Sequence, residues 1–172
     1  MPGKAREGFW ARDLLLGLVL APLVVVTCYQ PVRVSGQSMK PSLSNHERLL
    51  INRFLYRLTP IRRGDVIVFY FPLNPHDSFI KRVIGLPGDW VSMQHGVVFI
   101  NSRRLSEPYL RLGLRGQASF PLTRVPQDKY FVLGDNRAAS DDSRDWGMVP
   151  RQLIYGKAVF AYWPLRRVGV IR

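Results

Sequence analysis

Two residues of this sequence have the chemistry to cleave an amide bond together, Ser38 and Lys81. A serine hydroxyl becomes a nucleophile when a neighbouring base takes its proton, and a neutral lysine amine can be that base. An ordinary lysine, with a pKa near 10.4, is neutral in fewer than about 0.1% of molecules at pH 7, so burial would have to lower its pKa. In a strand over Phe79–Val83, Lys81 shares its face with the two apolar end residues, which favours burial. Each residue taken alone is more typical of a turn serine and of a surface lysine.

A polar loop that follows an apolar strand is the third candidate segment, Gly134-Asp-Asn-Arg-Ala-Ala-Ser-Asp-Asp-Ser-Arg-Asp-Trp-Gly147. Its short side chains could hold a second hydroxyl beside a lysine amine, braced by an aspartate–arginine pair. A calcium-binding loop is excluded by the spacing, because no acidic residue closes the loop twelve positions from its start. On its own, the pattern predicts a capped turn.

The elements that must position these residues begin with an apolar segment. Residues 14–32 carry no charge, and a helix of that length spans about 28 Å, enough for the hydrocarbon core of a bilayer. We interpret it as an uncleaved membrane helix rather than a cleaved signal peptide, because Gln30-Pro-Val-Arg33 lacks a small-x-small cleavage site. Ser38 would then lie within about 20 Å of the membrane boundary. Basic residues precede and follow the segment in equal numbers, so charge does not decide its orientation.

The chain after the apolar segment is typical of a mainly β domain. Short β-branched and aromatic runs, bounded by Gly, Pro, Asn or Asp, predict strands over 48–52, 65–71, 79–84, 90–93, 97–100, 130–133 and 158–163. Gln94-His-Gly96 predicts a hairpin turn. We therefore expect an N-terminal segment at 1–13, a transmembrane helix at 14–32 and a β-rich domain at 33–172, with a looser excursion at about 103–127.

The composition restricts the class of protein. The 172 residues include 25 Lys and Arg against 12 Asp and Glu, a net charge of +13, and a single cysteine, Cys28, which cannot form a disulfide within the chain. Zinc-ligand spacing and nucleic-acid-binding motifs are absent from the sequence, so the positive charge favours a solvated basic surface over a nucleic-acid site.

Taken in order and spacing, these segments resemble the motif series of the type I signal peptidases, membrane-bound serine proteases with a Ser/Lys dyad. The resemblance covers nearly the whole chain. Its most specific parts are Lys81-Arg-Val-Ile-Gly-Leu-Pro-Gly-Asp89 and the Gly134 loop. The other matching segments are 36–43, 63–69, 100–101, 107–109, 130–137, 140–144, 146–147 and 156–158.

The resemblance implies a role for seven residues. Ser38 would be the nucleophile, Lys81 the general base, and Ser140 the hydroxyl that orients the lysine amine. The supporting positions would be an ion pair and two loop-shaping residues, namely Asp142 with Arg144, and Asp135 with Asn136.

One position departs from the family pattern and concerns the oxyanion hole. In that family a hydroxyl two residues before the nucleophile sometimes assists the nucleophile's backbone N–H, and here that position is Gly36. The loss of one oxyanion donor can cost about 3–4 kcal/mol. Water, another donor or a neighbouring hydroxyl such as that of Ser35 would have to replace it.

The resemblance also implies the setting of the reaction. It implies no metal and no cofactor, preprotein signal peptides as substrates, membrane lipid as a partner, no nucleic acid, and a monomer. We expect a single-pass protein of the bacterial cytoplasmic membrane, with the catalytic domain on the export side. Three alternatives stay open: a conjugation-specific or organelle-type signal peptidase, a self-cleaving repressor with the same dyad, and a non-enzymatic membrane adaptor with a basic face.

Overall fold

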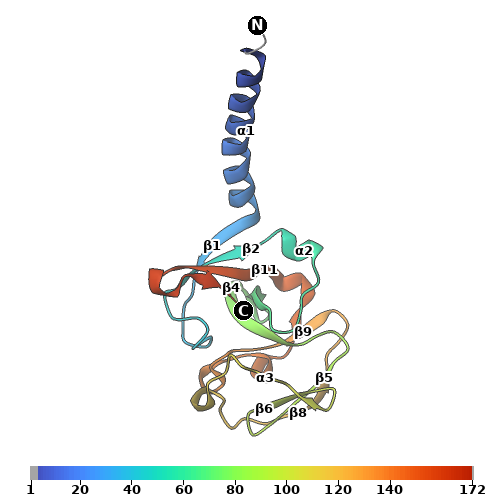
Figure 1. The fold of residues 1–172 in the computed structure, drawn as a ribbon. Coiled ribbons are helices and arrows are strands. Elements are labelled where there is room, and N and C mark those ends of the chain that lie inside the picture. The colour runs from blue at the N-terminus through green and yellow to red at the C-terminus, as the bar shows by residue number, and fades with distance from the viewer. Residues whose placement is uncertain (1–3, 172) are drawn as a thin grey trace.

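A long N-terminal helix leads directly into the first strand of a β domain (Figure 1). The computed structural model describes residues 4–171. Its helices and strands are α1 Lys4–Cys28, β1 Tyr29–Arg33, β2 Arg48–Asn52, α2 Leu55–Leu58, β3 Val66–Phe71, β4 Asn74–Gly85, β5 Trp90–Gln94, β6 Val97–Ile100, β7 Arg103–Arg104, η1 Leu112–Leu114, β8 Phe120–Arg124, β9 Lys129–Leu133, η2 Arg137–Ala139, α3 Ser143–Trp146, β10 Val149–Pro150, η3 Arg151–Leu153, β11 Ile154–Trp163, η4 Leu165–Arg167 and β12 Gly169–Val170.

The helix does not follow the predicted boundaries of the apolar segment. It ends at Cys28, and residues 29–32, the last four of the predicted segment, belong to β1, which pairs with β2 from Tyr29 opposite Asn52 onward. The prediction of a helix through Val32 was therefore wrong at its end, because pairing with β2 satisfies this backbone in a sheet. Of the predicted N-terminal segment 1–13, residues 4–13 form the first part of α1 and residues 1–3 lie outside the described residues. Between residues 4 and 171, no helix reaches the length and apolar character that a membrane crossing requires.

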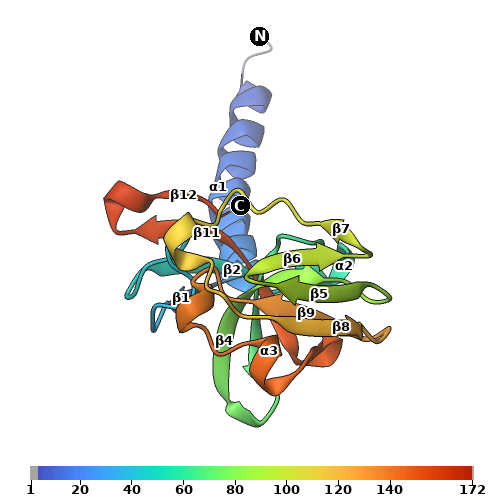
Figure 2. The ribbon, with the colours of Figure 1, turned by 90° about the horizontal axis from the view of Figure 1, so that it is seen from below.

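The strands form two antiparallel sheets, which confirms the prediction of a mainly β protein. The larger sheet has the order β1-β2-β11-β3-β4-β9-β10, with β12 added beside β11. The smaller has the order β7-β6-β5-β8, and Figure 2 shows it stacked to one side of the larger sheet. Chain segments distant in sequence, such as β2 and β11, are thereby direct neighbours.

The predicted strands correspond closely to observed ones. The run 65–71 became β3, and 79–84 is the inner half of β4. His95 and Gly96 connect β5 to β6 with φ of 46° and 77°, the positive values that a two-residue hairpin turn needs. The excursion at 103–127 contains β7, η1 and β8, and β8 pairs with β5. The sequence analysis missed these elements because each is only two to five residues long.

The core consists of three clusters of buried apolar side chains. One lies between the Ser38 loop and the sheet, and it includes Val34 before the turn, Met39 and Leu43 after it, and Leu49 of β2. The second surrounds Phe69 and Val83, and the third packs the small sheet against β9. The loop that carries Ser38 is therefore attached to the core on both sides of its turn.

Candidate active site

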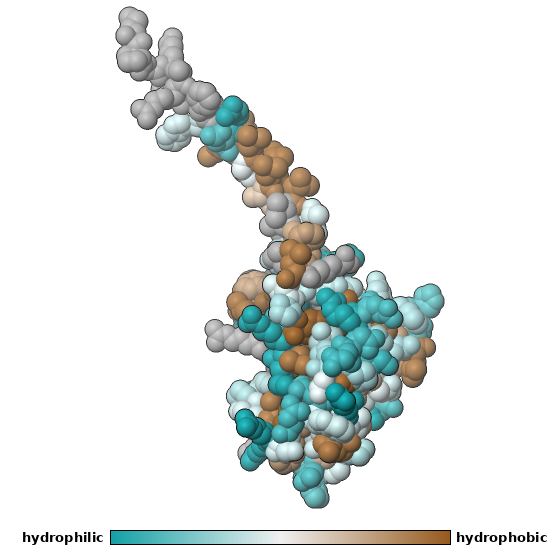
Figure 3. All heavy atoms as spheres, turned by 90° about the vertical axis from the view of Figure 1, so that its right-hand side faces the viewer, coloured by the Kyte–Doolittle hydropathy of each residue, from teal (hydrophilic) through white to brown (hydrophobic). Residues whose placement is uncertain are grey.

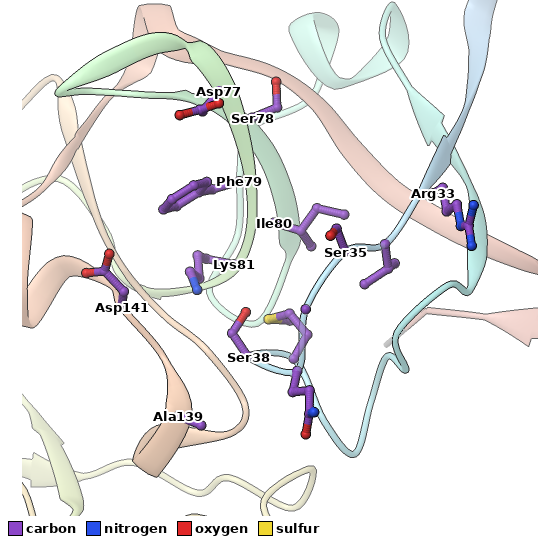
Figure 4. Close-up of a pocket in the computed structure, with 14 residues that line it drawn as sticks. Arg33, Ser35, Ser38, Asp77, Ser78, Phe79, Ile80, Lys81, Ala139 and Asp141 are labelled. Atoms are coloured by element: carbon purple, nitrogen blue, oxygen red, sulfur yellow. The ribbon is translucent and has the colours of Figure 1, made fainter.

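Ser38 lies on the loop between β1 and β2, where it lines a cleft of about 490 Å³ (Figure 4). The cleft walls come from this loop, from β4 and from the loop after β9. Gly36, with a φ of 98°, permits the tight turn before the serine, and its N–H donates to the Asn45 side chain at 3.0 Å. No described residue accepts a hydrogen bond from the Ser38 backbone N–H. The serine thus offers both a hydroxyl and an unused N–H in one cleft.

Lys81 reaches the same cleft from β4. Its residue surface is 4% exposed, and its Nζ lies 5.6 Å from the centroid of the Phe79 ring. The neighbouring Arg82 bonds instead to the Gly64 carbonyl at 2.8 Å and to the Asp135 carboxylate. Lys81 is therefore buried and has Phe79 of its own strand beside its amine, in agreement with the expected burial.

Burial lowers the pKa of the Lys81 amine below its usual value. The carboxylates of Asp142, Asp141 and Asp145 act in the opposite direction, and the Arg144 guanidinium adds to the lowering. Removal of water from the charged form outweighs the nearby negative charges, so the amine loses its proton more readily here than it does in water.

The Lys81 amine has one direct hydrogen-bond partner among the described side chains, Ser140. Its Nζ donates to the Ser140 hydroxyl at 3.1 Å. Figure 4 shows the Ser38 hydroxyl and the Lys81 amine pointing toward the same space. The two do not form a hydrogen bond in the described structure, and such bonds often tighten only when substrate binds. The geometry therefore brings Ser38, Lys81 and Ser140 together, as the sequence analysis expected.

Asp142 and Arg144 hold the loop segment that carries Ser140. The Asp142 carboxylate accepts from Arg144 Nε at 2.7 Å and from the Gly134 N–H at 3.0 Å. The Arg144 guanidinium donates to the Ser140 carbonyl at 3.0 Å. Asp142 also caps α3, through its bond from the Arg144 N–H. The expected ion pair is present and acts on the backbone of Ser140.

Asp135 and Asn136 contact different neighbours. Asp135 makes a buried bidentate ion pair with Arg82, at 2.8 and 2.7 Å. Asn136 donates from its backbone N–H to the Ser38 carbonyl at 2.8 Å and from its amide side chain to the Gln37 carbonyl at 3.3 Å. Asn136 therefore attaches the polar loop directly to the segment that carries Ser38.

The sequence analysis missed a buried polar cluster beside this loop. Arg137 pairs with the buried carboxylate of Glu107 and donates to the Gly134 carbonyl at 3.0 Å. The Tyr109 hydroxyl donates to Glu107 at 2.9 Å, and the Arg82 guanidinium stacks 4.1 Å from the Tyr109 ring centroid. All four residues lie in segments that match the motif series, but the motifs did not indicate that these side chains contact one another.

The arrangement can carry out acyl transfer. A hydroxyl, a buried amine and an unused backbone N–H at one cleft are the groups that attack on a carbonyl and stabilisation of its oxyanion require. Among residues 4–171, no three His, Cys, Asp or Glu side chains gather where they could hold a metal ion.

Comparisons with known proteins point to one family. The family model described as signal peptidase, peptidase S26, matches residues 9–163. A probable signal peptidase I-2 from Synechocystis is 41% identical, over 96% of this chain and 78% of the length of that protein. Signal peptidase I P from Bacillus subtilis subsp. natto is 38% identical over 92% of this chain and 90% of its own. A crystal structure of a signal peptidase I from Enterococcus faecalis superimposes with a TM-score of 0.51 at 36% identity, over 58% of this chain and 97% of its own.

Proposed function

The chain belongs to the signal peptidase family, peptidase S26, and from this premise we propose that it cleaves signal peptides from exported preproteins, with Ser38 as nucleophile and Lys81 as general base. One observation carries the assignment of the two residues. The Lys81 amine is buried, its pKa is lowered, and it is oriented by Ser140 at the cleft that Ser38 lines.

The reaction proceeds in two steps. The neutral Lys81 amine takes the Ser38 proton as the hydroxyl oxygen attacks the scissile carbonyl, and the lysine then gives that proton to the leaving amine of the mature protein. Lys81 next takes a proton from water, whose oxygen attacks the acyl-enzyme and releases the signal peptide carboxylate. Ser38 recovers its proton from Lys81, which leaves the amine neutral for another cycle.

The oxyanion of each tetrahedral intermediate needs donors at the same cleft. The Ser38 N–H is the first donor, because no described residue uses it. Gly36 has no side-chain donor, whereas Ser35 also lines the cleft and has an exposed hydroxyl. We assign Ser35 as the second donor.

The substrate segment can bind as an added strand. β9 pairs with β4 only at Arg82–Gly85, so the edge of β4 before Lys81 is open on that side. Ser78 and Ile80 belong to this part of β4 and line the cleft. An extended peptide can pair there and present its scissile bond to Ser38.

We propose that the protein is attached to the bacterial cytoplasmic membrane through the apolar surface of α1, as a monomer with the catalytic domain on the export side. Residues 14–28 carry no charge, and Figure 3 shows hydrophobic residues gathered along this helix. Ser38 follows Cys28 by ten residues, which limits its distance from the end of the helix to about 36 Å. Basic residues over 33–63 would hold the domain against anionic lipid, and binding to anionic vesicles should then weaken with salt.

The alternatives are less well supported. A membrane adaptor has no use for a buried lysine with a lowered pKa, and burying that amine without a function costs stability. The relatives named above are described as signal peptidase I rather than as conjugation-specific or organelle enzymes or repressors, which favours general preprotein processing.

Cleavage of a preprotein by the full chain in detergent tests the proposal. Ser38→Ala and Lys81→Ala should each abolish cleavage, and Lys81→Arg should fail as well, because a guanidinium stays protonated. Ser44→Ala and Lys129→Ala are matched controls outside the cleft lining and should retain activity. Full activity of Ser38→Ala or Lys81→Ala would refute the assignment of the dyad.

A further inference from the structure

The C-terminal segment folds back onto the loop that carries Ser38. After β11, residues 164–171 turn through η4 and return as β12, which pairs with β11 at Phe160 and Ala161. Ile171 donates its N–H to the Val159 carbonyl at 3.1 Å and packs on the cluster that contains Met39. We name residues 164–171 the C-terminal clasp. In Figure 1 it is the red hairpin at the same end of the sheet as the light-blue loop after β1.

Arg167 makes the polar contacts of the clasp with that loop. Its Nη2 donates to the Pro41 carbonyl at 2.9 Å and to the Ser42 carbonyl at 2.8 Å. Its Nε lies 3.0 Å from a carboxylate oxygen of Glu47, whose surface is 2% exposed. The same carboxylate oxygen accepts the Ser44 N–H at 2.7 Å. One guanidinium thus holds the backbone at two successive residues and a buried acid of the same loop.

These contacts lie close to the nucleophile in the chain. Pro41 and Ser42 follow Ser38 by three and four residues, and Leu43 donates its N–H to the Met39 carbonyl at 2.8 Å. On the other side, Asn136 holds the Ser38 carbonyl. The turn is therefore fixed by the polar loop at Ser38 itself and by Arg167 at Pro41 and Ser42, three and four residues later.

We propose that Arg167 is a positioning residue for Ser38, acting through the backbone of Pro41 and Ser42. The proposal rests on the proposed function of Ser38. The match to the family model ends at residue 163, so the clasp lies outside the residues that this model covers. Arginine suits the position because its planar fork has five donors in fixed directions, whereas the lysine ammonium is a compact charge on a flexible stem.

The test compares steady-state cleavage of a preprotein by the full chain in detergent, at a temperature where every variant is folded. Arg167→Ala should lower kcat about tenfold or more and leave KM within about twofold, because small misplacements of reacting groups are costly to rate. Arg167→Lys should recover only part of the loss. The adjacent Arg166 is exposed and forms no hydrogen bond or ion pair with the described residues of the Ser38 loop. It gives the matched control Arg166→Ala, with kcat as in the wild type.

A second variant separates the effect of Arg167 on the position of Ser38 from its effect on the stability of the fold. Arg167→Ala leaves the Glu47 carboxylate buried without this cation, so we also expect a lower melting temperature. Arg167→Ala combined with Glu47→Gln removes the unpaired charge, and the new side-chain amide keeps an oxygen that can accept the Ser44 N–H. We expect this double variant to recover melting temperature but not kcat. Added guanidinium ion should raise kcat in Arg167→Ala and leave Arg166→Ala unchanged.

Two outcomes distinguish the proposals from each other. A wild-type chain that cleaves preprotein, together with Arg167→Ala or the double variant at wild-type kcat when folded, overturns the positioning role alone. A wild-type chain that cleaves no preprotein overturns the proposed function, on which the positioning role rests.

Discussion

The Lys81 amine donates to the Ser140 hydroxyl at 3.1 Å, although the two residues are 59 positions apart in the sequence. Lys81 is on β4, and Ser140 is on the loop that follows β9, the strand paired with β4 from Arg82 onward. A neutral amine has one lone pair, and its two N–H groups must point elsewhere if the lone pair is to face a hydroxyl. The bond to Ser140 fixes one N–H and thereby restricts where the lone pair can point.

Removal of this hydroxyl should slow catalysis without unfolding the protein. We expect Ser140→Ala to lower kcat by roughly ten- to a hundredfold, part of the 10²–10⁴-fold contribution of a positioned general base. Ser140→Thr keeps the hydroxyl and should retain most of the activity. Steady-state cleavage with a melting curve for each variant measures both effects. Equal kcat values for the alanine and threonine variants would contradict the orienting role.

Replacement of Lys81 by methionine should stabilise the fold, most strongly at low pH. Because burial lowers the pKa of Lys81, the folded state binds fewer protons than the unfolded state between the lowered pKa and the unfolded value near 10.4. The wild-type free energy of unfolding therefore rises with pH through that window. Below it, the wild type carries the full cost of about 1.4 kcal/mol per unit of lowering.

Denaturant unfolding of the wild type and Lys81→Met at about pH 6, 8 and 10 measures this difference. The gap between the two free energies should narrow as pH rises. A gap that is constant or widens with pH would mean that the pKa of Lys81 is not lowered in the folded state.

The local features of the site could be predicted from the sequence. The alternation of side chains in a strand places Lys81 on the face of Phe79, and β-branched and aromatic runs located most of the strands, including β3 and β9. The motif series located the polar loop and the residues that contact Ser140. Side-chain alternation and strand runs depend only on residues that are near one another in the sequence. The motifs are recognised because they occur in the order of the family pattern.

Features that depend on distant partners could not be predicted in this way. Hydropathy is the same for an apolar helix through Val32 and for a helix that ends at Cys28, and only the pairing of β1 with β2 distinguishes them. Arg137 and its partner Glu107 are 30 residues apart, with no periodic pattern that relates them. Arg167 lies in a segment that resembles an ordinary basic tail, yet it contacts the Pro41 carbonyl 126 residues earlier in the chain.

Gly134 permits the close approach of the nucleophile loop and the polar loop. A Cβ at this position would overlap both the Ser140 hydroxyl and the Ser38 carbonyl. We therefore expect Gly134→Ala to displace these groups and to lower kcat more than about a hundredfold, since misplacement of about 1 Å can cost that much. Gly113→Ala is the matched control, because nothing lies within 4 Å of the added methyl group. Cleavage rates of both variants, with circular dichroism to verify folding, decide the prediction, which fails if Gly134→Ala is fully active.

The two charges of the Glu107–Arg137 ion pair should be coupled, so that the loss of one partner alone lowers the stability of the fold strongly. Both side chains are buried, at 2% and 0% exposure, so Glu107→Gln leaves the Arg137 charge without its counter-charge. We expect that change to lower the free energy of unfolding by about 3–5 kcal/mol, as is common when one partner of a buried pair is lost.

The combined variant Glu107→Gln with Arg137→Gln removes both charges and should be less destabilised than the sum of the two single variants, which a double-mutant cycle in urea measures. Asp128→Asn, at an exposed position, is the control and should change stability by less than about 0.5 kcal/mol. Additive losses in the cycle would contradict the coupling. Since Arg137 also donates to the Gly134 carbonyl, the single variants should lose cleavage activity as well, even where they are folded.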